Sequence, residues 1–199
     1  MLGALILLLT ACGSAGPRPE EGATVETGPA PALVADYQQA LRQLDDGDEA
    51  GAQARLQALA GEHAEYSGPL VNLALIHARR GELDEAGALL ERAVAVCTRC
   101  AEAWNELGVV QRRQGRFDEA ERSYLAALTA DPGYGNAHFN LGVLYELYLR
   151  RPALALDQYT RYLDLHAESP EAADVEKWMA DLKRRVGTVE RSARLEEPT

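Results

Sequence analysis

The chain has 199 residues, of which 47% are hydrophobic and 6% aromatic, and it carries a formal net charge of −11. That length is enough for one compact domain or a short array of repeats, and the composition suits closely packed helices. The acidic balance argues against nucleic acid and anionic headgroups as general partners, because phosphate binding requires clustered lysine and arginine.

The first segment in chain order predicts a signal peptide over residues 1–11. Leu2–Leu9 is an apolar run, too short to span a bilayer, which needs about 20 residues, but typical of a signal-peptide hydrophobic region. No lysine or arginine precedes this run. That departure leaves two alternatives open: a start upstream of Met1, or an apolar N-terminus with an unrelated cysteine.

The apolar run ends in Leu9-Thr10-Ala11-Cys12, which resembles the cleavage box of bacterial lipoproteins. The resemblance implies that Cys12 carries acyl chains of the palmitate class, and two or more such chains give stable membrane anchoring. Gly13 at the following position favours, by the same resemblance, an outer-membrane lipoprotein that faces the periplasm.

Residues 12–31 are rich in glycine, proline, serine and glutamate and have few apolar side chains to bury. We expect this segment to be a disordered tether between the lipid and the folded part. A flexible chain of that length reaches about 25 Å on average.

The centre of the chain repeats with a period of 34 residues, so that residues 67–100 and 101–134 align. Small and bulky residues recur at fixed repeat positions in the second stretch: Trp104, Leu107, Gly108, Ala120, Tyr124, Ala127 and Pro132. This spacing resembles the tetratricopeptide repeat family. The resemblance implies an all-α fold, a right-handed α-solenoid of about four helix-turn-helix units.

Two flanking segments complete the array of repeats. Residues 32–66 are interpreted as a degenerate N-terminal repeat with helices over Leu33–Asp46 and from Asp48 to about Ala60. Residues 135–168 form a fourth repeat with one inserted residue, which we place in its inter-helix turn because Ala155 rather than Leu154 aligns with the third repeat.

A capping helix is predicted over residues 169–187, beginning at Ser169 and ending at Gly187. Its apolar stripe would cover the exposed face of the last repeat, and burial of Trp178 should contribute roughly 2–3 kcal/mol. Residues 188–199 are interpreted as a charged, frayed tail. The stripe consists of Val175, Trp178, Met179, Leu182 and Val186.

Cys97 and Cys100 lie in the turn between two repeats. A structural disulfide is favoured, because lipidation of Cys12 leaves an even pair in an oxidising compartment. A reduced, inert pair is a second possibility, and redox activity or metal binding a third. The third lacks support from the sequence, since there is no βαβ context, no histidine after Cys100 and no second cysteine pair for zinc.

The resemblance to the repeat family also implies a concave groove lined by the first helix of each unit. Asparagine could hydrogen-bond an extended peptide, valine, leucine and phenylalanine could seat its side chains, and arginine could pair with a carboxylate. The alternative is that these are ordinary exposed helix positions. The candidate partner-binding residues are Asn72, Leu75, Arg79, Asn105, Val109, Arg112, Phe139, Asn140 and Val143.

No catalytic residue, metal site or cofactor is predicted. His77 and His138 occupy repeat positions that favour packing between helices. The expected function is a lipid-anchored periplasmic scaffold that binds protein partners and assists assembly of an envelope machine, such as a pilus or secretion channel. Two alternatives are an adaptor for peptidoglycan enzymes or an envelope motor complex and, more remotely, a thiol-disulfide enzyme using Cys97 and Cys100.

Overall fold

The computed structural model of this protein describes the backbone of residues 30–196 and the side chains of residues 30–187. The expected signal peptide, the lipidated Cys12 and nearly all of the expected tether lie outside these residues. Within residues 30–196, no helix is both long and apolar enough to cross a membrane.

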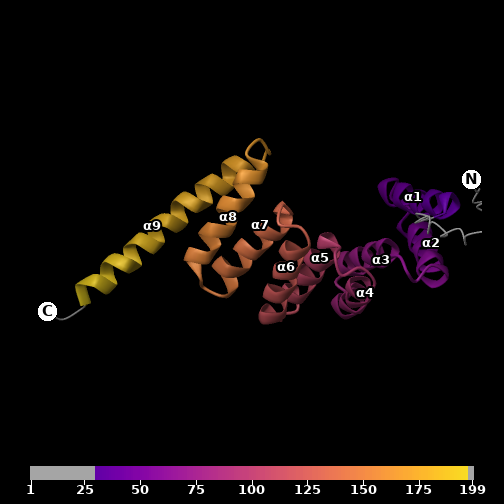
Figure 1. The fold of residues 1–199 in the computed structure, drawn as a ribbon, viewed down its shortest axis with the longest axis horizontal. Coiled ribbons are helices and arrows are strands. Elements are labelled where there is room, and N and C mark those ends of the chain that lie inside the picture. The colour runs from indigo at the N-terminus through magenta and orange to yellow at the C-terminus, as the bar shows by residue number, and fades with distance from the viewer. Residues whose placement is uncertain (1–29, 197–199) are drawn as a thin grey trace, which may run out of the picture.

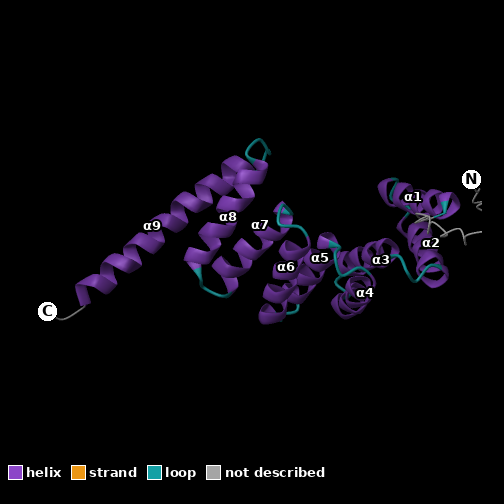
Figure 2. Ribbon diagram, viewed as in Figure 1, coloured by secondary structure: helices purple, strands orange, loops and turns teal. Residues whose placement is uncertain are grey.

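All regular structure in the described part of the chain is helical (Figure 2). Antiparallel helix pairs stack along the long axis of the molecule, and a single longer helix completes the C-terminal end (Figure 1). The predicted all-α solenoid of helix pairs is therefore confirmed. The elements are α1 (Pro31–Asp45), α2 (Glu49–Glu62), α3 (Ser67–Arg80), α4 (Leu83–Val96), α5 (Ala101–Arg113), α6 (Phe117–Ala130), α7 (Gly135–Val143), the π-helical turn η1 (Leu144–Tyr148), α8 (Pro152–His166) and α9 (Ala172–Glu196).

The turns inside the repeats follow from local sequence. Gly81 and Gly115 adopt φ angles of 83° and 78° after α3 and α5, a left-handed conformation that glycine takes without steric cost. In the first repeat the Asp48 side chain caps α2 by accepting a hydrogen bond from the Gly51 amide at 2.9 Å.

Close approach of the two helices of a repeat depends on glycine facing an aromatic ring. A Cβ atom added to Gly108 would lie 2.6 Å from Cε1 of Tyr124, and one added to Gly142 would lie 2.6 Å from Cε1 of Tyr159. Both tyrosines are buried. The same contact thus recurs 34 residues later on the first helix and 35 residues later on the second.

That one-residue difference locates the insertion in the fourth repeat. Ala155 is buried and Leu154 exposed, which confirms the alignment, but the extra residue lies in the first helix and not in the inter-helix turn. The amide of Leu149 donates to the carbonyl of Leu144 at 3.0 Å, the i→i−5 bond of a π-helix, which accommodates one additional residue. Arg150 then takes the left-handed position, with φ 53°.

The C-terminal helix differs from its predicted bounds. Ser169 belongs to a turn before α9, which begins at Ala172 and continues through Gly187 to Glu196. Gly187 therefore does not end the helix, and residues 188–196 are helical rather than frayed. Glycine in a helix interior costs only about 1 kcal/mol relative to alanine, and the residues that follow Gly187 are compatible with a helix.

The capping contact of α9 also uses a narrower stripe than predicted. Val175, Met179 and Leu182 are buried in one cluster with α8, whereas Trp178 is 50% exposed. These three residues are spaced i, i+4 and i+7 and face α8, and Trp178 is rotated away from that stripe. The expected burial of Trp178 is wrong.

Candidate partner-binding groove

The first helices of the repeats line the inner side of the solenoid. α3 packs on α5 and α5 packs on α7, while no comparable packing joins α4 to α6. Elements that approach one another most closely along a curved stack lie on its shorter, concave side. The groove expected from the family resemblance is therefore formed by α3, α5 and α7, with α9 at its C-terminal end.

An apolar line follows the floor of this groove. Leu75, Val109 and Val143 lie 34 residues apart on successive first helices, and each is half-buried. Phe139 extends the line towards α9, where its ring centroid lies 6.2 Å from that of Trp178. Four of the predicted groove residues thus form one surface, and Trp178 is a member that the sequence assigned to the core.

The groove asparagines are engaged between helices. Asn140 donates its amide to Oδ1 of Asn105 at 3.0 Å, and Asn105 donates to Oε1 of Glu106 at 2.9 Å. Asn105 is only 1% exposed, so its predicted contact with a partner is not available without rearrangement. Asn72 donates to the Tyr37 hydroxyl at 2.6 Å and to the Gly68 carbonyl at 3.1 Å.

The groove arginines are also occupied by contacts within the chain. Arg79 lies 3.2 Å from a carboxylate oxygen of Glu49. Arg112 donates to the hydroxyls of Tyr124 and Tyr148, at 3.4 and 3.3 Å, and its guanidinium lies 5.6 Å from the Tyr148 ring centroid. The expectation that these arginines wait for a partner's carboxylate is not supported by this geometry.

Two carboxylates on α5 lie in the groove without an ion-pair partner among the described residues. Glu102 has no ion-pair or hydrogen-bond partner among the described residues, and Glu106 accepts only from Asn105. Burial raises the pKa of Glu106, with a further contribution from Glu102 that the Asn105 hydrogen bond opposes. Glu106 is not among the predicted groove residues, although it holds the repeat position of Asn72 and Asn140.

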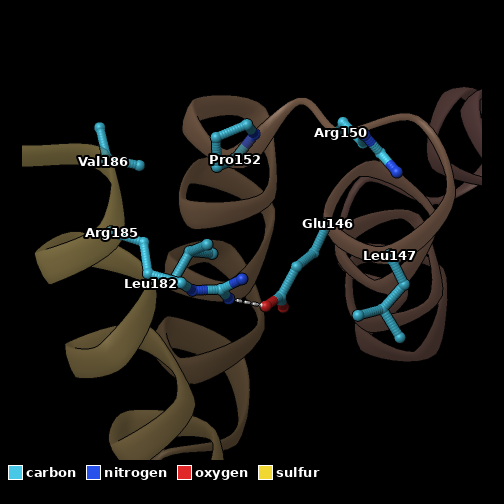
Figure 3. A pocket seen from close by; sticks show the side chains of 7 residues that line it. All are labelled: Glu146, Leu147, Arg150, Pro152, Leu182, Arg185 and Val186. Carbon is cyan, nitrogen blue, oxygen red and sulfur yellow. Dashed lines mark hydrogen bonds and ion pairs between the residues drawn. The ribbon is translucent and has the colours of Figure 1, made fainter. Parts of the chain in front are cut away.

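Helix α9 closes the groove and creates cavities against the last repeat. Figure 3 shows one of about 430 Å³ where α9, α8 and η1 meet, with Arg185 of α9 paired to Glu146 of η1. Glu146 also accepts a hydrogen bond from the Tyr159 hydroxyl at 3.1 Å. A second cavity of about 460 Å³ is lined by Phe139 and Trp178.

Cys97, Cys100, His77 and His138 make their contacts outside the groove. Cys97 and Cys100 are joined as a disulfide in the turn between α4 and α5, where the Ser67 hydroxyl lies 3.6 Å from Sγ of Cys100. His77 is hydrogen-bonded to Glu82 at 2.6 Å, and His138 to Gln158 at 2.8 Å. Across residues 30–196, no group of three His, Cys, Asp or Glu residues is placed to hold a metal ion.

The fold and the groove define a class of helical-repeat proteins that serve as scaffolds for protein–protein interaction. Two family models, each described as tetratricopeptide repeat, match residues 65–131 and 107–170. This chain belongs to the tetratricopeptide repeat family. No curated protein matches its sequence.

Solved structures similar to this chain are repeat proteins of different sizes. PilF of Pseudomonas aeruginosa is 27% identical, with a TM-score of 0.68 over 81% of this chain and 72% of that one. A chain of the APC/C hetero-tetramer Cut9–Hcn1 is 18% identical, with a TM-score of 0.65 over 74% of this chain. An O-GlcNAc transferase from Thermobaculum terrenum is 30% identical, with a TM-score of 0.58 over 65% of this chain. The chain spans only 29% and 26% of the last two.

Proposed function

We propose that this protein is a scaffold that holds an extended segment of a partner protein in its concave groove. The observation that carries the proposal is the apolar line of Leu75, Val109 and Val143, continued by Phe139. These side chains are half-buried on the inner face, while the groove residues Asn72, Asn105 and Arg79 are already engaged within the chain. Apolar side chains of a partner would bury this surface, and its backbone would lie along it.

A photo-crosslinking experiment tests this use of the groove. A p-benzoylphenylalanine residue at Val109 should form a covalent adduct with a partner protein in the bacteria that produce this protein. Val143→Glu places a charge further along the same apolar line and should abolish the adduct. The matched controls place the crosslinker at Leu125, an exposed apolar residue of the second helix α6, and the charge in Leu125→Glu. An adduct at Val109 that survives Val143→Glu would contradict groove binding.

The proposal extends to the place where the scaffold works. A lipid on Cys12 would anchor the chain in the outer membrane facing the periplasm, and residues 12–31 would carry the folded repeats away from the surface. Support comes from the sequence Leu9-Thr10-Ala11-Cys12. Replacement of Cys12 by alanine should move the protein from the membrane fraction to the soluble fraction, and unchanged fractionation would refute the anchor.

Within the envelope, we favour a role in assembling a machine such as a pilus or secretion channel. Small repeat lipoproteins with that role resemble this chain in architecture. An adaptor for peptidoglycan enzymes or an envelope motor complex is the second candidate. The proteins recovered as Val109 adducts distinguish the two: channel or pilus subunits support the first, and cell-wall enzymes the second.

A further inference from the structure

A third cavity, distinct from the two described above and also of about 460 Å³, opens where the start of α7, the end of α8 and the start of α9 meet. Its walls include the rings of Phe139, Tyr162 and Trp178. The Phe139 centroid lies 5.3 Å from that of Tyr162 and 6.2 Å from that of Trp178. Three aromatic rings from three helices therefore form a continuous wall, and half of the Trp178 surface is open to solvent.

Two carboxylates lie among the polar groups of this cavity. Glu171 and Asp174 line it together with Asn136, Ser169 and the His166 imidazole, and no lysine or arginine does. Asp174 is paired at 2.9 Å with Lys177, whose side chain is 74% exposed, an arrangement that contributes little energy in water. The Glu171 carboxylate has no ion-pair or hydrogen-bond partner among the described residues.

A buried hydroxyl in the same cavity has no partner. Oγ of Ser169 is inaccessible to solvent and makes no hydrogen bond within the described part of the chain. A buried polar atom left without a partner destabilises the protein. A ligand that brings a donor into the cavity would relieve this cost once the Ser169 side chain rotates towards it.

Two carboxylates also lie along the approach to the cavity. Glu102 and Glu106 on α5 have no ion-pair partner among the described residues, and Arg79 is paired with Glu49. Arg112 keeps its positive charge, because its partners are the neutral hydroxyls of Tyr124 and Tyr148. A partner segment that follows the groove towards α9 therefore passes these two carboxylates before it reaches the aromatic wall. Electrostatic complementarity selects a basic segment.

We propose that this cavity binds a lysine or arginine side chain of the partner segment. The cationic head would lie against the rings of Phe139, Tyr162 and Trp178, whose faces attract a cation, with Glu171 and Asp174 close to it. Its N–H groups would supply donors for the Ser169 hydroxyl. This inference rests on the proposed function, since it names the chemistry of the segment that the groove receives.

The two tryptophans of the chain provide the measurement. The indole N–H of Trp104 donates to the Thr98 carbonyl at 3.0 Å and serves as an internal reference, while Trp178 lines the cavity. Capped glycine-serine pentapeptides with a central arginine, lysine, norleucine or glutamate are titrated into the ¹⁵N-labelled protein. The arginine and lysine peptides should shift the Trp178 indole signal saturably and leave that of Trp104 in place.

Norleucine has the stem of lysine without its charge and is the decisive comparison. An equal shift with the norleucine peptide would show that the pocket is merely apolar. A larger shift with the glutamate peptide would show that the cavity prefers a negative charge. The absence of a saturable shift with any peptide would show that there is no site. Each of these three results overturns the proposal.

Two pairs of charge-removing substitutions test whether the cavity carboxylates themselves bind the cation. Glu171→Gln with Asp174→Asn should weaken binding of the arginine peptide at least about threefold. The matched control, Glu168→Gln with Glu176→Gln, makes the same change in net charge at exposed positions near the cavity and should leave binding unchanged. Equal weakening in both pairs would reduce the effect to general electrostatics and overturn the site.

The peptide titration and the crosslinking experiment fail independently. Adducts at Val109 together with no Trp178 response would leave the groove scaffold intact and remove only the cation site. A selective Trp178 response without adducts at Val109 would remove the groove proposal and leave a cation-binding cavity.

Discussion

At Gly108 and Gly142 the absent side chain lets a tyrosine ring of the second helix lie directly against the first helix. Tyr124 and Tyr159 fill the space that a Cβ atom would occupy. The helices of a repeat are therefore held together by shape, and a single methyl group is enough to disturb them.

We expect Gly108→Ala to lower the free energy of unfolding by about 1–3 kcal/mol, because the new Cβ forces the buried Tyr124 ring to move. Chemical denaturation of both proteins measures the change. The matched control is Gly61→Ala in α2, where a Cβ would meet no atom within 4 Å; it should stabilise by about 0.5–1 kcal/mol. Stabilisation by both substitutions would contradict the contact.

Ionisation of Glu106 should make the stability of the folded chain depend on pH. Its pKa is raised above the ordinary 4.5, first by burial, so the folded chain holds this proton more tightly than the unfolded chain. Stability is therefore lost as the pH rises from the unfolded value through the folded one. Glu106→Gln keeps an acceptor for Asn105 and cannot ionise.

We expect Glu106→Gln to melt at a higher temperature than the unaltered protein at pH 7 and to show a smaller difference at pH 4. Thermal melts at both pH values measure this, with Glu91→Gln at an exposed position of α4 as control. A variant that is less stable at pH 7 would show that the charged carboxylate contributes to the fold.

At the scale of elements, the fourth repeat and α9 show how the fold tolerates departures from the repeat. The π-helical turn over Leu144–Tyr148 takes up one inserted residue before the inter-helix turn, so α8 still packs through Ala155 and Tyr159. A helical bulge preserves the packing of both flanking helices, whereas a longer turn would shift the second one. Helix α9 likewise continues through a glycine that usually marks an end.

Substitution of Gly187 distinguishes a helix interior from a helix end. Because Gly187 lies inside α9 and a Cβ there would meet no atom within 4 Å, Gly187→Ala should raise the free energy of unfolding by about 0.5–1 kcal/mol. Urea denaturation followed by circular dichroism measures this. At a left-handed C-terminal cap the same change would destabilise, so a loss of stability would place the end of the helix near Gly187.

At the scale of the whole molecule, the core is divided along the stack. One apolar cluster contains residues of α1 to α5, another contains residues of α6 to α9, and a small third cluster of Ala101, Ala127 and Ala137 joins α5, α6 and α7. Each repeat contacts mainly its neighbours, so stability is close to a sum of repeat and interface contributions. A terminal repeat needs a cap for its exposed face, and α9 provides one through Val175, Met179 and Leu182.

We expect Leu182→Ala to destabilise the C-terminal repeats by about 2–4 kcal/mol, since Leu182 is 1% exposed and its removal opens a cavity in the cap. Hydrogen exchange should show the loss of protection in α7 to α9 and little change in α1 to α4. The control is Leu147→Ala, which removes an exposed leucine. Uniform loss of protection over all repeats would contradict the divided core.

The sequence by itself determined the helix pairs, their glycine turns and the packing of Gly108 with Tyr124. These features depend on residues within one 34-residue unit, where spacing fixes which side chains share a helix face. It also placed Leu75, Val109 and Val143 on the inner face, because repeat position alone decides that.

Only the tertiary structure decided which groove side chains are free. Asn105 is closed off by Asn140 from the next repeat, and Arg112 is held by Tyr148, 36 residues further on. Trp178 is half-exposed because Val175, Met179 and Leu182 are the side chains of α9 that are buried in the cluster with α8. Hydrogen bonds and burial between units depend on how the units stack, and the pattern within one unit carries no information about that contact.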